Sequence, residues 1–366
     1  MRAAVLDVAG EPTRIEELEL DAPRAGELLV RIAASGVCHS DLHVRDGDWP
    51  RPGPIVLGHE GAGVVVAVGD AVDPRLVGRL VALTWYYPCL RCRNCQAGRQ
   101  WACTESGSLQ HGMADGSTRL HRPDGEDVRA YLGIGTMAEL QVVTVEAAVV
   151  MPEGIAPAVA ALIGCCVSTG VGAVVKTASV PAGSTVAVWG LGGVGLSVVM
   201  GAVLAGASRI VAVDRVPEKL ERAGELGATH TVLAGDDGPT TVNRVKEAAG
   251  NGGPDFAFEA IGLPTTIEQS IASLPLGGTA VLVGLTPFGV RASFDAFDFV
   301  DGSRRVLGSN YGAAVAAIDF PRYAELHLAG RLPIERLIER TIGLDDLEEA
   351  FDVMRRGAGL RRVVVP

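Results

Sequence analysis

The chain has 366 residues, more than one hydrophobic core usually organises, so its length favours two domains. Its composition, 48% hydrophobic and 20% charged, is that of a globular protein. The formal net charge of -11, with acidic and basic residues interspersed, argues against a polyanionic partner and leaves no basic stripe for nucleic acid or anionic lipid. A soluble protein that acts on a small molecule is therefore favoured.

The N-terminus has neither the basic start nor the apolar core of a signal peptide, so we expect a cytoplasmic protein. Two uncharged stretches, 154–175 and 185–207, are long enough to raise the question of a membrane span. The first contains Pro157 and several glycines, and the second has the pattern of a glycine-rich strand, turn and helix. Burial inside an α/β core explains both better than a membrane.

Residues 1 to about 150 alternate short apolar runs with glycine and proline turns, which predicts an irregular β-rich domain. The expected strands are 3–6, 27–33, 63–68, 80–83 and 140–143. The segment 106–129 is polar, rich in Gly, Asp and Arg, and lacks a clean period. We expect it to form a long loop or lobe, either functional or a plain surface excursion.

From about residue 155, apolar strands alternate with alanine-rich helical stretches, which is typical of a parallel sheet with crossover helices. The expected strands are 186–189, 210–213, 256–259 and 280–283. After about residue 310 the pattern predicts helices around 320–329 and 345–356 and a short final strand.

A glycine-rich turn follows the expected strand 186–189 and precedes a helix-compatible run, 196–205. It comprises Gly190, Leu191, Gly192, Gly193, Val194 and Gly195. Glycines at this spacing permit a tight turn and a close approach of the backbone to a pyrophosphate, which the N–H groups of the following helix can bind. Taken alone, the pattern also fits a simple turn.

Asp214 ends the next expected strand, where a carboxylate can accept hydrogen bonds from the adenosine ribose hydroxyls. This context predicts a dinucleotide site. Asp214 would repel a 2′-phosphate, so we expect NAD in preference to NADP. The neighbouring Arg215 and Lys219 weaken that preference, because a cation can accommodate the extra phosphate.

Four of the seven cysteines stand close together, at Cys89, Cys92, Cys95 and Cys103. In a cytosolic chain such crowding favours metal thiolates over disulfides. Four thiolates close a tetrahedral shell around zinc with no open position, so we expect a structural zinc that ties down a lobe. Four incidental thiols are the alternative.

A second set of candidate ligands is dispersed along the chain. It includes Cys38, which is followed by His39, Ser40, Asp41 and His43. It also includes His59 with Glu60, and Cys165 with Cys166. Two thiolates and one imidazole would bind zinc and leave a fourth position for water or substrate, as a catalytic zinc requires. Spacing alone leaves the alternatives open: His59 as a structural histidine and Cys165 as a small buried hydrophobe.

These motifs, in this order and over nearly the whole chain, resemble those of the medium-chain zinc-dependent alcohol dehydrogenases. The matching segments are 38–43, 58–63, the four-cysteine loop, 164–170 and the glycine turn. The resemblance implies an α/β chain with three parts. They are a chaperonin-10-like β-rich catalytic domain with the structural-zinc lobe (1–155), a Rossmann NAD-binding domain with a doubly wound parallel sheet (156–309), and a C-terminal return to the catalytic domain (310–366).

The resemblance places a catalytic zinc on Cys38, His59 and Cys165. Cys166 stands where the family commonly has glycine and is left to pack. Asp41 matches the carboxylate that orients the zinc-bound histidine by fixing its tautomer. Glu60 matches the acidic residue behind the zinc.

In the family a hydride passes from the alcohol to NAD, and zinc acts as a Lewis acid on the alcohol. Ser40 matches the relay hydroxyl, and His43 matches the terminal base connected through the cofactor ribose. Histidine suits that end because its pKa ordinarily lies near working pH; a surface histidine is the alternative for His43. The resemblance assigns His39, Thr169 and Arg361 to cofactor binding, with His39 where relatives often have an arginine near the pyrophosphate.

The bulky side chains of Trp49, Trp85, Tyr131 and Leu132 fall where relatives line the substrate pocket, which they would narrow. Aromatic residues in a β domain are also often core residues. Gly47 and Trp49 occupy places relevant to seating a glutathione-type adduct, which argues against thiol-dependent formaldehyde oxidation.

The segment 106–132 matches the longer loop of the animal and glutathione-dependent branches, which are usually dimeric, so we expect a homodimer, with a tetramer as the alternative. The whole pattern predicts an enzyme with two zinc ions per chain and NAD. It would interconvert a primary alcohol, whether aromatic, allylic or aliphatic, and its aldehyde. One alternative is the same fold reducing a conjugated double bond or an iminium, against which Ser40 and His43 argue. Another is a binding protein that retains NAD and zinc without turnover.

Overall fold

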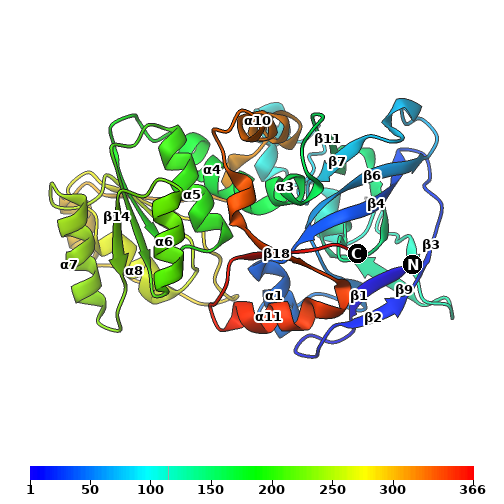
Figure 1. The fold of residues 1–366 in the computed structure, drawn as a ribbon, viewed down its shortest axis with the longest axis horizontal. Helices are drawn as coiled ribbons and strands as arrows, with labels where there is room; N and C mark the ends of the chain where they lie inside the picture. The colour runs from blue at the N-terminus through cyan, green and yellow to red at the C-terminus, as the bar shows by residue number, and fades with distance from the viewer. Residues whose placement is uncertain (114) are drawn as a thin grey trace. The chain divides into compact units, whose positions relative to one another are not determined.

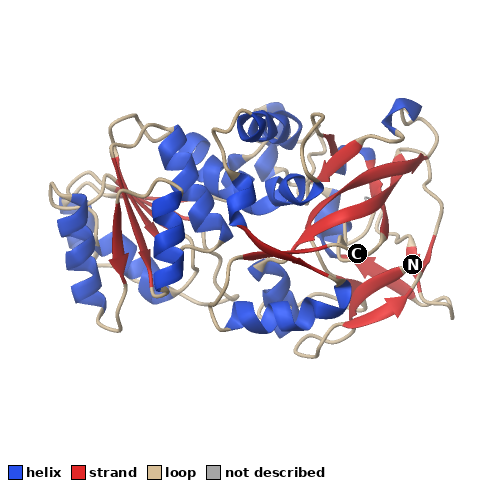
Figure 2. Ribbon diagram, in the orientation of Figure 1, coloured by secondary structure: helices blue, strands red, loops and turns tan. Residues whose placement is uncertain are grey.

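The structure, a computed structural model, describes residues 1–113 and 115–366. Its contacts divide the chain into two compact units, Met1–Cys165 with Val315–Pro366, and Cys166–Ala314. The limits expected from the sequence were 155/156 and 309/310. Figures 1 and 2 show that the first unit is rich in strands and that helices flank the sheet of the second.

The first unit contains two sheets. One has the order β2-β1-β5-β9-β8-β3, and the other has the order β11-β7-β6-β4-β19-β18 with β10 beside β4. Their bounds are β1 (Arg2–Leu6), β2 (Arg14–Glu17), β3 (Glu19–Leu20), β4 (Glu27–Gly36), β5 (Ile55–Val56), β6 (Glu60–Val68), β7 (Leu80–Leu83), β8 (Leu120–His121), β9 (Asp127–Ala130), β10 (Leu140–Thr144), β11 (Ala148–Val150), β18 (Ile338–Ile342) and β19 (Arg361–Val364). In β4, Leu28, Val30 and Ile32 are buried at alternate positions, as a strand with one face on a core requires.

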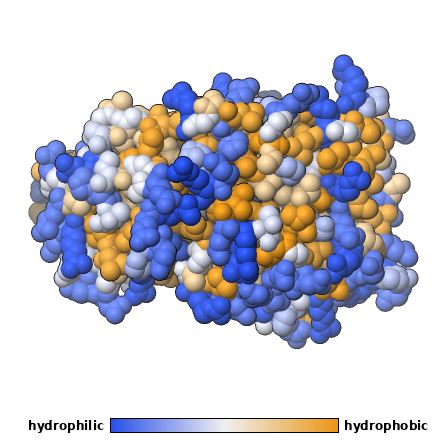
Figure 3. All heavy atoms as spheres, in the orientation of Figure 1, coloured by the Kyte–Doolittle hydropathy of each residue, from blue (hydrophilic) through white to orange (hydrophobic). Residues whose placement is uncertain are grey.

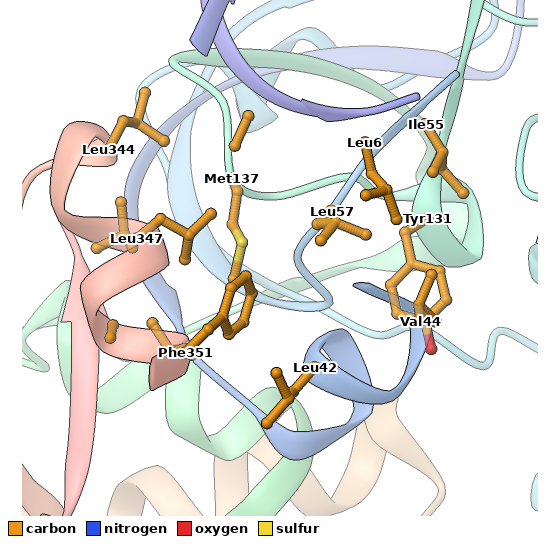
Figure 4. Packing of buried hydrophobic residues seen from close by; sticks show 14 of the residues in the cluster. Leu6, Leu42, Val44, Ile55, Leu57, Tyr131, Met137, Leu344, Leu347 and Phe351 are labelled. Carbon is orange, nitrogen blue, oxygen red and sulfur yellow. The ribbon is translucent and has the colours of Figure 1, made fainter. Parts of the chain in front are cut away.

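The C-terminal segment returns to the first unit, because β19 pairs antiparallel with β4. Just before β19, helix α11 (Leu347–Arg355) packs near α1 (His39–Asp46), the short helix that follows β4. Figure 4 shows Leu347 and Phe351 of α11 in one apolar cluster with Leu42 of α1. The residues between β4 and β6 are thus held by packing against the end of the chain.

The second unit is a six-stranded parallel sheet in the order β14-β13-β12-β15-β16-β17. Numbered along the chain, this order is 3-2-1-4-5-6, which is that of a Rossmann fold, and it reverses between β12 and β15. The bounds are β12 (Thr185–Trp189), β13 (Arg209–Asp214), β14 (His230–Leu233), β15 (Phe256–Glu259), β16 (Thr279–Leu282), β17 (Arg305–Gly308), α5 (Gly193–Leu204), α6 (Pro217–Glu225), α7 (Gly238–Ala249), α8 (Pro264–Ala272) and α9 (Ala296–Asp301). In this fold ligands bind beyond the carboxyl ends of the strands, at the point of reversal.

Among the described residues, one helix, Pro157–Thr177, is long and apolar enough to cross a membrane by length and composition. Most of it is buried inside the protein, as expected for a core helix. It consists of α3 (Pro157–Leu162), the π-helical turn η6 (Ile163–Val167), α4 (Ser168–Gly172) and a second π-helical turn, Ala173–Thr177. The other uncharged stretch of the sequence forms β12 and α5.

The segment 106–129 has more structure than the expected loop. It contains the 3-10 turn η3 (Gly107–Gln110) and the antiparallel pair of β8 and β9. Arg119, just before β8, is buried and makes an ion pair with Glu27 at 2.6 Å. This pair fastens the segment to the start of β4.

The surface carries hydrophilic side chains with apolar ones between them, as Figure 3 shows for one face. Large exposed apolar side chains include two on α9, Phe297 at 79% and Val300 at 76% exposure. Helix α9 directly precedes β17, the last strand in the order of its sheet. An exposed edge strand next to apolar side chains is a feature of association surfaces.

Candidate metal centres and nucleotide site

Four residues that are distant in the sequence meet in the first unit: Cys38, His59, Glu60 and Cys165. Their ligand atoms lie within 4.8 Å of one another, and all four residues are buried. Cys38 stands between β4 and α1, His59 and Glu60 stand at the start of β6, and Cys165 lies in the π-helical turn η6. The structure therefore brings together the dispersed ligands that the sequence analysis selected.

The pairing of β4 with β6 explains this convergence. Gly36 lies opposite Glu60 in the register, so Cys38 and His59 emerge at the same end of the sheet. A Cβ on Gly36 would lie 2.2 Å from Glu60 Oε2 and 3.1 Å from Glu60 Cβ, so a larger residue there would displace the Glu60 side chain. The third segment, η6, is a π-helical turn, a deviation that is frequent at functional sites.

The buried Asp41 carboxylate orients the candidate histidine ligand. Its Oδ1 lies 3.0 Å from His59 Nδ1 and accepts a hydrogen bond from the Gly58 N–H, also at 3.0 Å. Because the carboxylate accepts, Nδ1 carries the hydrogen, and Nε2 has the free lone pair. Nε2 is buried without a hydrogen-bond partner among the described residues. A metal ion between this nitrogen and the two sulfurs would satisfy it, so the donor set fits zinc.

The charges at this cluster favour a thiolate at Cys38 and a proton on His59. A hydrogen bond with Cys165, followed by the charges of Arg361 and His59, holds the pKa of the Cys38 thiol well below its ordinary value although the thiol is buried. Burial opposes a charge on His59, but Asp41 and Cys38 outweigh it and raise the pKa of His59, so a metal ion that binds at Nε2 must displace a proton from the ring. Cys38 is thus disposed to be a thiolate, the form that binds metal ions.

Glu60 faces an arginine from the C-terminal strand. Arg361 of β19 donates a hydrogen bond to Glu60 Oε2, and both side chains are buried. Burial raises the pKa of Glu60 to about 8, against the opposing charge of Arg361. The structure thus places Arg361 against Glu60 of the cluster. Its expected approach to a pyrophosphate stays a prediction.

The two candidate relay residues lie on α1, immediately after Cys38. Ser40 and His43 are half-buried and are three residues apart, so they share one face of the helix. His39, assigned from the sequence to the cofactor, is the first residue of α1 and is exposed. Its ring centroid lies 6.3 Å from that of His43.

Three of the four expected pocket residues contact the rings of the site. Tyr131 meets the His59 ring edge-on at a centroid distance of 5.7 Å, and Trp85 does so at 6.4 Å. Trp49 stacks on His43 at 4.5 Å. Aromatic side chains therefore border the candidate metal ligand and the candidate base.

The fourth pocket residue, Leu132, is buried with a φ of 52°, a left-handed conformation. Its N–H donates to Nδ1 of His111 at 3.1 Å, and the His111 ring stacks on Tyr131 at 5.7 Å. Burial, with the charges of Arg51 and Arg129, lowers the pKa of His111 to about 4. Sequence analysis missed His111, because it lies in the segment without a periodic pattern.

The four clustered cysteines form a second, separate set. The ligand atoms of Cys89, Cys92, Cys95 and Cys103 lie within 4.8 Å of one another. Backbone N–H groups point at the sulfurs: the Cys92 N–H donates to Cys89 Sγ and the Cys89 N–H donates to Cys103 Sγ, both at 3.3 Å. Such a set would hold zinc in a closed tetrahedral shell, the form of a structural site.

In the second unit, Asp214 lies beside the glycine turn. It ends β13, and its carboxylate accepts hydrogen bonds from the Leu191 N–H at 2.7 Å and the Val216 N–H at 3.0 Å. Arg215 makes an exposed ion pair with Asp236 at 2.6 Å. Of the remaining residues assigned to the cofactor, Lys219 lies on α6 and Thr169 is buried in α4.

The glycines of the turn have different surroundings. A Cβ on Gly195 would lie 1.7 Å from the Gly190 carbonyl oxygen, so Gly195 must be glycine for the turn to close. Gly192 directly precedes α5, whose first two residues are Gly193 and Val194. A Cβ on Gly192 would meet no atom within 4 Å. Gly192 thus leaves room beside the helix N-terminus, where a phosphate group can approach the backbone.

Two family models match the chain. The model of the alcohol dehydrogenase GroES-like domain matches residues 24–153, and the model of zinc-binding dehydrogenases matches residues 193–328. The first range includes Cys38, His59 and the four clustered cysteines, and the second includes most of the parallel sheet.

Named relatives align over the full chain. An NDMA-dependent alcohol dehydrogenase from Amycolatopsis methanolica is 36% identical over 370 residues, which cover 100% of this chain and 98% of the relative. An S-(hydroxymethyl)glutathione dehydrogenase from Paracoccus denitrificans is 34% identical over 377 residues, with coverages of 100% and 99%. The solved structure of benzyl alcohol dehydrogenase from Acinetobacter calcoaceticus is similar with a TM-score of 0.91 and 31% identity, over 100% of this chain and 98% of that one.

Proposed function

This chain belongs to the medium-chain zinc-dependent alcohol dehydrogenases, and from that premise we propose that it interconverts a primary alcohol and its aldehyde by hydride transfer with NAD. One observation carries the proposal. Cys38, His59 and Cys165 converge in a buried cluster in which His59 Nε2 has no hydrogen-bond partner among the described residues.

In this proposal, Cys38, His59 and Cys165 hold the zinc. When bound there, zinc supplies Lewis acidity that makes the hydroxyl of an alcohol more acidic. Asp41 keeps the His59 ring in the tautomer that ligation requires. Ser40 and His43 carry the hydroxyl proton toward solvent, since a hydroxyl can relay a proton and a histidine can accept it near neutral pH.

The cofactor part of the proposal rests on the second unit. The glycine turn and the N-terminus of α5 would bind the pyrophosphate of NAD, and Asp214 would bind the adenosine ribose. NAD supplies the hydride acceptor. NAD is favoured over NADP because Asp214 would repel a 2′-phosphate.

Aromatic primary alcohols are the first substrates to test. The rings of Trp85 and Tyr131 contact His59, and aromatic side chains favour stacking or edge contacts with an aromatic substrate. The similarity to a benzyl alcohol dehydrogenase agrees with this choice. Allylic and aliphatic alcohols are also consistent with the pocket residues, because a single methylene changes discrimination by only about 1 to 3 kcal/mol.

The test is a substrate panel on protein of measured metal content. Benzyl, cinnamyl and hexyl alcohols and S-(hydroxymethyl)glutathione are each supplied with NAD or NADP, and NADH or NADPH formation is followed at 340 nm. We expect turnover of at least one simple alcohol with NAD. If S-(hydroxymethyl)glutathione is the only compound of the panel that is oxidised, the proposed substrate class is wrong. The Amycolatopsis relative is named as NDMA-dependent. If this chain also turns over only when NDMA is added, the proposal that NAD is a free co-substrate is wrong.

We further propose a homodimer. The long 106–132 segment, typical of dimeric branches, and the exposed apolar side chains of α9 beside the edge strand β17 support it.

A further inference from the structure

The end of α1 folds back on His43. Gly47 follows the helix with a φ of 88°, a left-handed conformation that glycine adopts without strain. The Gly47 N–H donates to the Val44 carbonyl and the Trp49 N–H donates to the His43 carbonyl, both at 3.2 Å. This reversal places Asp48 and Trp49 against His43, which precedes them by five and six residues.

Two contacts fix the His43 ring. Asp48 Oδ2 lies 2.7 Å from His43 Nδ1, and the indole of Trp49 stacks on the imidazole at 4.5 Å with an interplanar angle of 27°. Trp49 is buried, and 20% of the His43 side chain is exposed. The ring is therefore held at its face and at one nitrogen, while part of it reaches solvent.

The hydrogen bond to Asp48 decides which nitrogen can accept a proton. A carboxylate only accepts hydrogen bonds, so His43 Nδ1 carries the hydrogen. In the neutral ring, Nε2 is then the basic nitrogen. Without a partner at Nδ1, the ring would divide between two tautomers, and one of these has no lone pair at Nε2.

We propose that Asp48 is a positioning residue for proton release, which it achieves by holding His43 with Nε2 as the proton acceptor. The proposal rests on the proposed function, because it concerns the proton that alcohol oxidation sets free. That proton leaves the alcohol oxygen by way of Ser40 and binds to Nε2. The imidazolium keeps its Nδ1 hydrogen bond to Asp48, and Nε2 then loses the proton to solvent. Asp48 gains no proton in this sequence.

The kinetic test compares Asp48→Ala, Asp48→Asn, His43→Ala and the double variant Asp48→Ala/His43→Ala. Asp48→Ala should lower kcat by about 10- to 100-fold with little change in KM, because part of the general-base contribution is lost. Asp48→Asn keeps an oxygen that can accept from Nδ1 and should retain most of kcat. The double variant should be as slow as His43→Ala, because Asp48 acts through His43. Asp46→Ala, which removes a nearby carboxylate that pairs with Arg355, is the matched control and should leave kcat unchanged.

A second measurement does not need turnover. Imidazole ¹⁵N shifts of histidine-labelled protein, recorded where the ring is neutral and assigned with His43→Ala, should show the Nδ1–H tautomer of His43 in the wild type and a mixture in Asp48→Ala. If the wild type oxidises no alcohol, the proposed function fails, and these spectra still decide whether Asp48 fixes the ring. Unchanged shifts in Asp48→Ala, unchanged kcat in that variant, or a further loss of rate when Asp48→Ala is added to His43→Ala would each overturn the proposal.

Discussion

Two adjacent buried cysteines, Cys165 and Cys166, differ in their neighbours. Only Cys165 belongs to the cluster with Cys38, His59 and Glu60, although both lie in the π-helical turn η6. Consecutive residues of a helix point in different directions, which agrees with a cluster that includes Cys165 and not Cys166. The pair therefore provides a substitution and its control within one turn.

We predict that Cys165→Ser loses one of two zinc ions per chain and lowers alcohol oxidation by at least about 100-fold, because a ligand of the catalytic metal is lost. Cys166→Ser should keep both ions and most of the activity. Metal analysis of the dialysed variants, together with NADH formation, measures both effects. Equal losses in the two variants would show that the turn as a whole matters, and not the Cys165 sulfur.

His111 makes a prediction about acid stability. Its pKa is lowered to about 4 in the folded chain, while an unfolded histidine titrates near 6.5. Between these values the unfolded chain binds the proton and the folded chain does not, so stability falls as the pH drops from about 6.5 to 4. With a discount for partial exposure, the loss is on the order of 2 kcal/mol.

His111→Asn keeps an acceptor for the Leu132 N–H and cannot titrate. Urea unfolding at pH 7 and pH 5 should therefore show a smaller acid-induced loss for this variant than for the wild type. The zinc ligands titrate in both proteins, so the difference between them isolates His111. Parallel pH profiles would rule out a neutral, buried His111.

At the scale of elements, the turn between β12 and α5 contains one glycine that the fold requires and another that nucleotide binding requires. Gly195→Ala would place a Cβ against the Gly190 carbonyl, whereas Gly192→Ala would meet no atom within 4 Å. We predict that Gly195→Ala destabilises the chain by about 2 kcal/mol or more. Gly192→Ala should leave the Tm nearly unchanged and weaken NAD binding by about tenfold, because the methyl group occupies the approach of the pyrophosphate.

Thermal melting and NAD titration calorimetry of the two glycine variants check this pair. If Gly192→Ala binds NAD as tightly as the wild type, the pyrophosphate does not bind at this turn.

The sequence predicted the continuously apolar strands well and the strands with exposed positions poorly. The expected strands 186–189, 210–213, 256–259 and 280–283 agree within one residue with β12, β13, β15 and β16, because their buried residues form continuous apolar runs. β14 and β17 were missed, since their exposed positions interrupt the apolar pattern. The pair β8 and β9 was missed because β8 has only two residues and β9, with Asp127 and Arg129 in it, has no continuous apolar run.

In the site, too, residues that are close in the sequence were easier to predict than residues that are distant in the sequence. Spacing identified the four-cysteine set, whose members are close in the sequence. Residue type made Cys38, His59 and Cys165 candidates for one zinc site, but spacing left the alternatives open. The register of β4 with β6 and the turn η6, which bring the three residues together, cannot be read from spacing. The Asp48 contact with His43 depends on the reversal at Gly47, and no sequence signal identified it.

At the scale of the whole molecule, the proposed homodimer predicts a role for α9. Phe297→Asp would place a charge among exposed apolar side chains at the sheet edge, so it should weaken association. Sedimentation velocity should give a dimer for the wild type and a monomer, or a concentration-dependent mixture, for the variant. Val8→Asp, at an exposed apolar position of the first unit, is the control and should remain dimeric.

The most direct measurement is an anomalous-difference map recorded at the zinc absorption edge on crystals of the purified protein. We predict two peaks per chain. One should lie about 2.3 Å from the sulfurs of Cys38 and Cys165 and about 2.0 Å from His59 Nε2, and the other should lie among the four clustered cysteines. A chain with no zinc peak at the three dispersed residues, although the cysteine loop is occupied, would contradict the proposed chemistry.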